Sequence, residues 1–155
     1  MITFIGDFVC KPDVKGRIVL PARFKRSMQA VEQDCFVVRK HTFESCLEMI
    51  PYSGWLKEVA ILEKKLNGFN PKEQRLKRAL FRSSAEVTLD GNGRFLVPRR
   101  LMDLVGVDGE VILLGVGDRL ELWDRSRMEA DEPDEEEMKM LAAELLGTRT
   151  SDLDE

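Results

Sequence analysis

The sequence lacks most of the residues and motifs on which enzymes depend. It has one histidine, His41, one tyrosine and three cysteines among 155 residues. No serine lies in a G-x-S-x-G turn, no H-E-x-x-H pair is present to bind zinc, and no G-x-x-x-x-G-K-[ST] loop is present to hold a phosphate. We therefore expect no catalytic residue and no cofactor, and we interpret the protein as a non-enzyme.

The few cysteines exclude a disulfide framework. Cys10, Cys35 and Cys46 are an odd number, and their spacing is not that of metal ligands. The alternative is a metal site that joins His41 to Cys35 and Cys46, but this spacing matches no known ligand pattern. We interpret the cysteines as buried or half-buried thiols in a reducing compartment, and we expect no metal.

Long apolar runs are also missing. No stretch of 18 apolar residues would form a membrane span, and Met1–Asp7 has no basic segment of the kind that opens a signal peptide. A composition of 43% apolar and 34% charged residues is typical of a soluble globular protein. We expect a cytoplasmic protein without a membrane partner or a small-molecule substrate.

The net charge of −4 conceals two regions of opposite sign. Residues 1–120 carry 20 basic and 15 acidic residues, whereas residues 121–155 carry 4 and 13. The body is thus +5 and the C-terminal part −9. Because salt screens charges beyond roughly 8–10 Å, a ligand senses the local field rather than the total. A basic body with an acidic tail is compatible with an anionic partner.

The chain contains an internal repeat. Asp13–Pro21 and Asp90–Pro98 share the pattern D-x-x-G-R, three apolar residues and proline, and each copy continues with an arginine, Arg23 or Arg100. Further on, Leu47–Ile50 matches Leu120–Trp123. The offset is 77 at the first match and 73 at the second, so we expect about four extra loop residues in the first copy. Two ordered matches indicate a duplication.

The residue pattern predicts the same elements in both copies. We expect strands at 2–10, 17–20, 35–39 and 45–50 in the first copy, and at 86–89, 94–97, 110–115 and 119–123 in the second. A helix follows each proline, at 22–31 and from Pro98 to a stop at Gly106. Two helices join the copies: Ser53 caps the first, and Asn70 caps the second with Pro71 at its first position and Glu73 completing a capping box. A short helix is expected at 136–146.

These elements predict an α+β fold that is rich in β-structure. The divisions that we expect are a first repeat at 1–52, a helical linker at 53–84, a second repeat at 85–128 and an acidic tail at 129–155. An isolated hairpin is marginally stable in water, so each repeat must pair with another copy.

The D-x-x-G-R unit has two interpretations. The aspartate accepts backbone N–H groups and pairs with the arginine, which either only locks the turn or also presents cations to phosphates and base edges. Pairing with an arginine makes acid–base chemistry by Asp13 and Asp90 an unfavoured alternative. Residues 11–26 have a net charge of +5 and residues 88–103 of +1. We therefore favour nucleic-acid contact, and we expect the loss of Arg17 to lower the affinity for DNA more than the loss of Arg94.

The motif followed by a basic helix resembles the AbrB-type swapped-hairpin DNA-binding unit. Two copies joined by a helical segment with Asn70-Pro71-x-x-x-Arg75-x-x-Arg78 are similar to the MraZ family of bacterial transcriptional regulators. The resemblance covers roughly residues 1–146. It implies a pseudo-twofold barrel of interleaved β-hairpins, ring-shaped homo-oligomers, DNA contact through the first-copy loop and strand, and regulation of the division and cell-wall gene cluster, including the protein's own promoter.

The expected interface lies mainly in the first copy. The candidate DNA-binding residues are Lys11, Lys15, Arg17, Arg23, Lys25 and Arg26, with Asp13 and Gly16 as structural residues. The matching motif of the second repeat is Asp90, Arg94, Arg99 and Arg100. Arg17, with Arg23 or Lys25, is the candidate for reaching base edges, and the other cations would neutralise phosphates.

The expected partners are double-stranded promoter DNA with repeated sites, at the nucleoid, and further copies of the chain. The rival interpretation is an oligomeric protein-interaction scaffold without direct DNA binding. In it, the acidic tail and the basic face of the second linker helix pair between subunits or with another protein. That face carries Lys72, Arg75, Lys77, Arg78 and Arg82. Salt dependence separates the two, because phosphate contacts weaken steadily with salt.

Overall fold

The computed structural model describes residues 2–66 and 68–153. Its strands are β1 (Phe4–Cys10), β2 (Ile18–Val19), β3 (Cys35–Lys40), β4 (Leu47–Pro51), β5 (Ser84–Thr88), β6 (Arg94–Phe95), β7 (Val111–Gly117) and β8 (Leu120–Asp124). Its helices are α1 (Ala22–Ala30), α2 (Tyr52–Lys65), α3 (Pro71–Arg82), α4 (Arg99–Leu104), α5 (Arg125–Asp131) and α6 (Glu135–Leu153). Among the described helices, none combines the length and apolar character of a membrane span.

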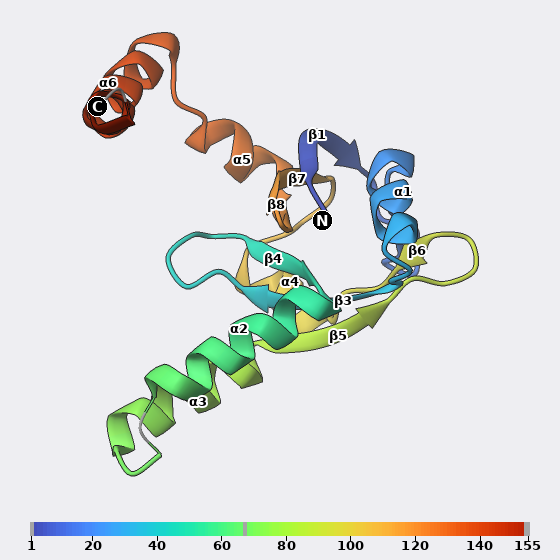
Figure 1. Cartoon of the computed structure of the whole chain (residues 1–155). Coiled ribbons are helices and arrows are strands. Elements are labelled where there is room, and N and C mark those ends of the chain that lie inside the picture. The colour runs from blue at the N-terminus through green and yellow to red at the C-terminus, as the bar shows by residue number, and fades with distance from the viewer. Residues whose placement is uncertain (1, 67, 154–155) are drawn as a thin grey trace.

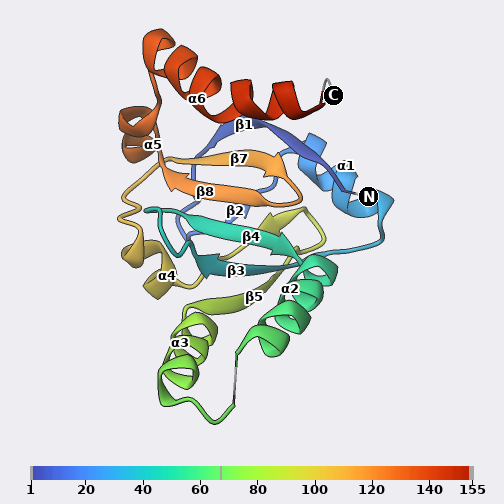
Figure 2. The same ribbon diagram turned by 60° about the vertical axis from the view of Figure 1, so that its left-hand side comes forward.

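The main sheet is shared between the two repeats (Figures 1 and 2). Its six strands lie in the order β1-β7-β8-β4-β3-β5, and every neighbouring pair is antiparallel. The first repeat supplies β1 to β4 and the second β5 to β8. When each strand is replaced by its counterpart in the other repeat, the same sheet is obtained, counted from its other edge, so the sheet has a pseudo-twofold arrangement. Each outer strand pairs with the other repeat: Phe4 lies opposite Gly117, and Cys35 opposite Thr88. The two repeats are therefore interleaved.

The α+β class predicted from the sequence is confirmed. The sheet is open, however, because within the described residues β1 and β5 have no strand on their outer edges. The strands β2 and β6 form a separate two-stranded ribbon, in which Ile18 lies opposite Phe95 and Val19 opposite Arg94. The interleaved hairpins that the resemblance implies are present, but they do not close into a barrel.

The core lies between the sheet, the β2–β6 ribbon and the helices α1 and α4. Phe24 and Met28 of α1 and Leu101 of α4 are fully buried, as are Ile18 and Phe95 of the ribbon. Each such side chain contributes about 1.5–3 kcal/mol by leaving water. Burial of one residue from each ribbon strand holds the ribbon against the sheet and fixes the turns that precede it.

The linker helices confirm one expected cap and correct the other. Asn70 caps α3, since its side chain accepts the N–H of Lys72 at 2.9 Å, and Pro71 opens the helix. Ser53 does not cap α2, which begins at Tyr52 directly after β4. Instead, the Oγ of Ser53 accepts from Nε2 of Gln33 at 2.7 Å. The strand runs straight into the helix through Pro51, so no residue remains between them to act as a side-chain cap.

The extra residues expected in a loop of the first copy are present, whereas the length of the tail helix differs. Residues 41–46 join β3 to β4, and only residues 118–119 join β7 to β8, a difference of four. Helix α1 is also longer than α4, with nine residues against six, but the segment that follows it is shorter. The tail forms α5 and then α6, which has 19 residues and extends beyond the expected helix at 136–146 in both directions. In Figure 1 this tail runs away from the sheet.

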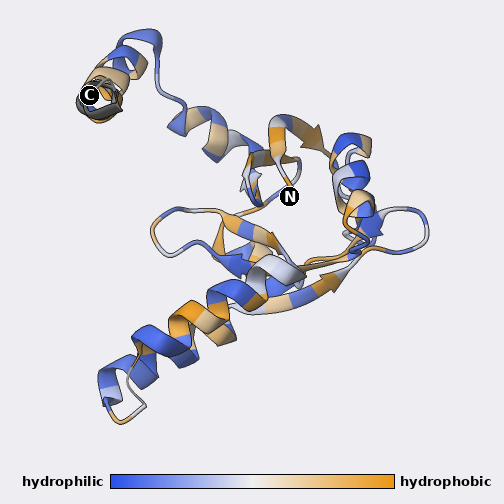
Figure 3. Ribbon diagram, in the orientation of Figure 1, coloured by the Kyte–Doolittle hydropathy of each residue, from blue (hydrophilic) through white to orange (hydrophobic). Residues whose placement is uncertain are grey.

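The α2–α3 hairpin projects from the opposite end of the molecule (Figures 1 and 2). Neither helix has a buried residue. The rings of Trp55 and Phe81 meet edge to face at 5.7 Å, and Lys77 pairs with Glu63 at 2.6 Å. An apolar band on α2 lies midway along the hairpin, orange in Figure 3.

A charged network ties this hairpin to the sheet. Glu48 on β4 pairs with Arg39 on β3 at 3.1 Å and with Arg119 of the β7–β8 turn at 2.7 Å. Glu58 of α2 pairs with Arg39 at 2.8 Å and also with Arg119. The guanidinium of Arg39 lies 5.6 Å from the centre of the Trp55 ring. Because these groups are largely removed from water, losing one partner leaves the others poorly compensated.

Candidate nucleic-acid interface

The first D-x-x-G-R turn is held by its aspartate. Oδ1 of Asp13 accepts the backbone N–H groups of Lys15 and Arg17, each at 2.9 Å, and Oδ2 accepts from Nε of Arg17 at 2.8 Å. Two backbone hydrogen bonds between Asp13 and its neighbours close the turn, and Gly16 adopts a φ of +86°. This φ lies in the region that glycine adopts without a steric penalty.

The second turn has the same set of bonds. Oδ1 of Asp90 accepts the N–H groups of Asn92 at 2.8 Å and Arg94 at 2.9 Å, and Oδ2 accepts from Nε of Arg94 at 2.9 Å. Gly93 has a φ of +73°. The backbone N–H of the arginine is the main cause that lowers the pKa of Asp90, as it is for Asp13. Both carboxylates are thus ionised acceptors that aim an arginine, not acid–base groups.

The two turns lie at opposite ends of the β2–β6 ribbon. Because β2 and β6 are antiparallel, the turn that precedes one strand lies beside the end of the other: the N–H of Leu20 donates to the carbonyl of Gly93 at 2.9 Å. Val19 and Leu96 point to solvent, 60% and 54% exposed. The ribbon therefore presents an open face with one arginine-aiming turn at each end.

The interleaving places the first repeat's helix beside the second turn. Helix α1 starts just after Leu20, which contacts Gly93. The side chain of Lys25 lies so close to Gly93 that a β-carbon added there would be 3.1 Å from Nζ. Arg23 and Arg26 are exposed on the same helix. Of the cations of α1, Lys25 is thus a neighbour of the second turn.

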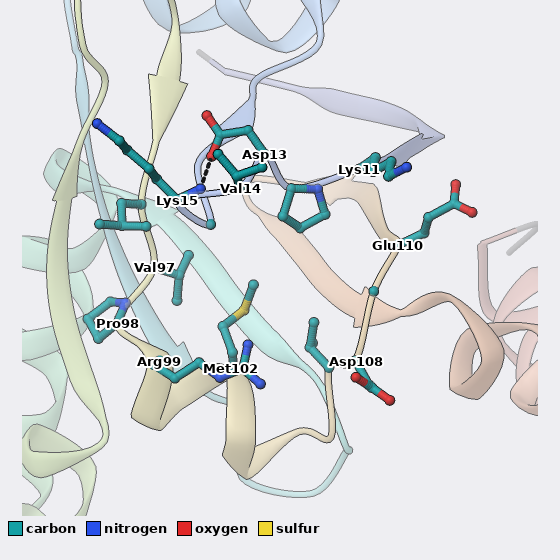
Figure 4. A pocket seen from close by; sticks show the side chains of 15 residues that line it. Lys11, Asp13, Val14, Lys15, Val97, Pro98, Arg99, Met102, Asp108 and Glu110 are labelled. Carbon is teal, nitrogen blue, oxygen red and sulfur yellow. Dashed lines mark hydrogen bonds between the residues drawn. The ribbon is translucent and has the colours of Figure 1, made fainter.

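The first turn borders the second repeat across a cleft of about 800 Å³ (Figure 4). One wall is the loop from Lys11 to Gly16, and the other is formed by residues 96–99, Met102 and residues 107–110. Figure 4 shows Lys11 and Glu110 on one side of the cleft and Lys15 on the other, with its side chain pointing away from them. Asp108 also lines the cleft, so acidic residues of the second repeat lie near the first turn.

The candidate cations differ in whether their side chains already form an ion pair or hydrogen bond within the chain. Arg17 and Arg94 pair with their aspartates, Arg99 pairs with Asp103 at 3.0 Å, and Nη1 of Arg100 donates to the carbonyl of Arg82 at 2.7 Å. Within the described part of the chain, four exposed candidates have no side-chain hydrogen bond or ion pair: Lys11, Lys15, Arg23 and Arg26. These four are available to an external anion.

The +5 segment at residues 11–26 is therefore not one surface. Lys11 and Lys15 lie at the first turn, whereas Lys25 lies at the second. Sequence reasoning missed both the position of Lys25 and the acids opposite the first turn. A charge count along the chain contains no signal for either, because the strand exchange alone decides which helix each turn meets.

The cysteines and the histidine lie elsewhere. Cys10 and Cys35 are half-buried and Cys46 is buried, and burial raises the pKa of all three thiols. Nδ1 of His41 accepts the N–H groups of Phe43 and Glu44, each at 3.1 Å, and so orders the β3–β4 loop. No cluster of three or more potential metal ligands occurs among the residues described.

Two interleaved hairpin repeats around one ribbon define a tandem swapped-hairpin protein. A model of the family described as "MraZ protein, putative antitoxin-like" matches residues 80–145. The chain is 38% identical to the transcriptional regulator MraZ of Phocaeicola vulgatus, over 84% of this chain and 83% of that protein. It is 36% identical to that of Bacteroides fragilis, over 83% and 82%, and 32% identical to that of Christiangramia forsetii, over 95% of both chains. The chain belongs to the MraZ family.

Proposed function

We propose that the protein is a sequence-specific DNA-binding transcriptional regulator without enzymatic activity. Its relatives are named transcriptional regulators. One observation carries the proposal: two matched turns lie at the two ends of one exposed β-ribbon, with Lys11 and Lys15 at the first turn and Lys25 at the second, none of them in an ion pair among the described residues. Two-stranded ribbons that enter a groove are an established way of contacting DNA.

The residues have separate roles in this proposal. Lys11, Lys15, Arg23, Lys25 and Arg26 neutralise phosphates and set the position on the duplex. Arg17 and Arg94, each aimed by its aspartate, reach base edges with the groups that the carboxylate leaves free. Asp13 and Gly16 keep the first turn in shape, as Asp90 does for the second, and Arg99 and Arg100 support α4. The repeats at 1–52 and 85–128 thus act as one module.

The biological setting follows from the family resemblance. We propose a cytoplasmic protein at the nucleoid that acts on the division and cell-wall gene cluster, including its own promoter. A ring of identical subunits would present many ribbons, and tandem operator repeats would then be bound with avidity by weak individual contacts. The linker at 53–84 and the tail at 129–155 lie outside the DNA-contacting module.

A salt titration with paired variants tests the DNA contact. The affinity of the protein for duplex DNA from its own upstream region is measured by fluorescence anisotropy from 50 to 400 mM salt, beside a scrambled duplex. Each phosphate contact adds roughly 0.9 to the log–log slope, so K11A/K15A and R23A/R26A should each reduce it by about two per ribbon. R99A/R100A is the matched control and should change the slope less, because these arginines already have partners.

Two results would contradict the proposal. If the affinity for DNA hardly changes with salt, phosphate contacts do not carry the binding, and the roles proposed for these cations are wrong. If the upstream and scrambled duplexes bind equally at every salt concentration, the interaction is electrostatic but not sequence-specific.

A further inference from the structure

The α2–α3 hairpin has an apolar groove that the DNA-contacting module does not use. The groove has a volume of about 350 Å³ and lies beside β3. Its apolar lining consists of Trp55, Val59, Ile61, Leu62 and Leu80. Ile61 is 54% exposed, and neither helix buries a single residue. A hairpin of this kind gains stability when another apolar surface covers it.

The hairpin is also strongly basic. Residues 52–82 contain eight basic and three acidic residues, a net charge of +5. Lys65 lines the groove, and Lys64 precedes it in the last turn of α2. Duplex DNA would satisfy these cations but would leave the apolar lining exposed. The occupant that matches both features is an acidic helix with an apolar stripe.

The tail of the chain has this chemistry. Residues 129–147 contain eight acidic residues and one basic residue, a net charge of −7. On α6, Met138, Leu141 and Leu145 recur at i, i+3 and i+7 and are 58%, 45% and 58% exposed. Glu137 and Glu144 lie four residues before and three after Leu141, so they flank the stripe on one side.

A tail and a hairpin of the same chain do not meet. In both views of the molecule, α6 and the α2–α3 hairpin project from opposite ends (Figures 1 and 2). We propose that α6 of one copy docks in the α2–α3 groove of the next copy. With 14 and 19 residues, α2 and α6 are about 21 and 28 Å long, so the helix can cover the groove. This interface joins two different surfaces, and such head-to-tail contacts form a ring when the rotation from copy to copy closes.

This inference rests on the self-association in the proposed function but not on its DNA contact. Two charge-reversal variants test it: K64E/K65E in the hairpin and E137K/E144K in the tail. The mass of each is measured by light scattering at 50 mM salt without DNA, against a chain mass of 17.7 kDa. Each variant alone brings like charges together, and its mass should fall to half of the wild-type mass or less.

Mixing is the decisive step. In an equal mixture, the reversed tail meets the reversed hairpin and the unaltered tail meets the unaltered hairpin, so the wild-type mass should return. The quadruple variant in one chain should regain it as well. K11E/K15E is the control, which should keep the wild-type mass and lose DNA affinity.

Each other outcome overturns the docking. Unchanged masses of the two reversal variants mean that these charges are not at the interface, and a fall without recovery on mixing means that they do not face each other. If K64E/K65E keeps its mass and loses DNA affinity, the hairpin contacts DNA instead. A wild-type mass of one chain at micromolar concentration contradicts the docking and the ring together, whereas loss of DNA binding at full mass contradicts the proposed DNA contact alone.

Discussion

The two D-x-x-G-R turns have the same hydrogen bonds but different neighbours. Each aspartate accepts two backbone N–H groups and the Nε of its arginine. Around them, Asp108 and Glu110 line the cleft beside the first turn, whereas Lys25 covers Gly93 in the second. The motif alone therefore determines the shape of the turn, and the exchange of strands determines its electrostatic surroundings.

The repeats diverge further at an equivalent pair of glutamates. Glu48 on β4 pairs with Arg39 and Arg119, while Glu121 on β8 accepts only the Nε1 proton of Trp123, at 3.0 Å, among the bonds described. The first glutamate supports the linker hairpin and the second serves a local contact. Duplicated positions have thus acquired separate structural tasks, and variants in matched pairs measure how far they differ.

The largest expected effect is on the free energy of unfolding, at the equivalent glutamates Glu48 and Glu121. Glu48→Gln should lower the free energy of unfolding by about 3 kcal/mol, since two arginines each lose one of their carboxylate partners in a place with little water. That corresponds to a fall in Tm of roughly 6–12 °C. Glu121→Gln should cost less than about 0.5 kcal/mol, because the amide oxygen still accepts from Trp123. Thermal unfolding of both variants checks this, and equal losses would show that the network has no special role.

The arginines of the turns compare the two ends of the ribbon in DNA binding. Arg17→Ala and Arg94→Ala should each cost about 1–3 kcal/mol per site, roughly 5- to 150-fold in affinity. We expect the loss at Arg94 to be at least as large as at Arg17, because Lys25 of α1 lies at the second turn whereas Asp108 and Glu110 line the cleft beside the first. Affinities for the upstream duplex measure both. If Arg94→Ala binds nearly as well as wild type while Arg17→Ala loses much affinity, Arg17 is the more important residue, as the charge of residues 11–26 along the chain predicts.

The glycines test the packing of Lys25. Gly16→Ala and Gly93→Ala should each destabilise the fold by about 1–2 kcal/mol, since both glycines have a positive φ. Gly93→Ala should have the larger effect because Lys25 must move, whereas Gly16 faces only the end of Leu96 at 3.4 Å. It should also weaken DNA binding. Denaturant unfolding gives the free energy of unfolding, and the same affinity measurement gives the DNA affinity. Identical values for the two variants would show that Lys25 does not pack against the second turn.

The smallest expected effect is the loss of stability at low pH that comes from the aspartates of the two turns. The pKa of Asp13 and of Asp90 lies below its ordinary value of 3.8, so the unfolded chain binds a proton before the folded one does. The contribution of the turns to stability is therefore present above the ordinary pKa of 3.8 and is lost as the pH falls through the lowered pKa. The amide signals of Arg17 and Arg94 in NMR spectra should shift together below pH 3.8. Asp13→Asn should abolish only the first shift, and a midpoint above pH 3.8 would contradict the hydrogen-bonded carboxylate.

Local chemistry was predictable from the sequence. The turn around Asp13, the start of α1 after Pro21 and the cap at Asn70 each depend on neighbouring residues, and the strands follow from short apolar segments. The partner of a strand is not encoded in this way: nothing in Phe4–Cys10 specifies pairing with β7 rather than with β3. The place of Lys25 and the acids of the cleft depend on that pairing, so they could not be predicted. Whether these residues contact DNA stays a prediction.

The interleaved sheet also sets the order in which the chain can become structured during synthesis. β3 and β4 are close in sequence and can pair early, but Phe4 must wait for Gly117 to emerge from the ribosome. Until then the N-terminal strand has no partner, and the first repeat exposes open strand edges. Contacts of such sequence separation slow folding. The nascent chain therefore has to stay soluble until more than two thirds of it has been made.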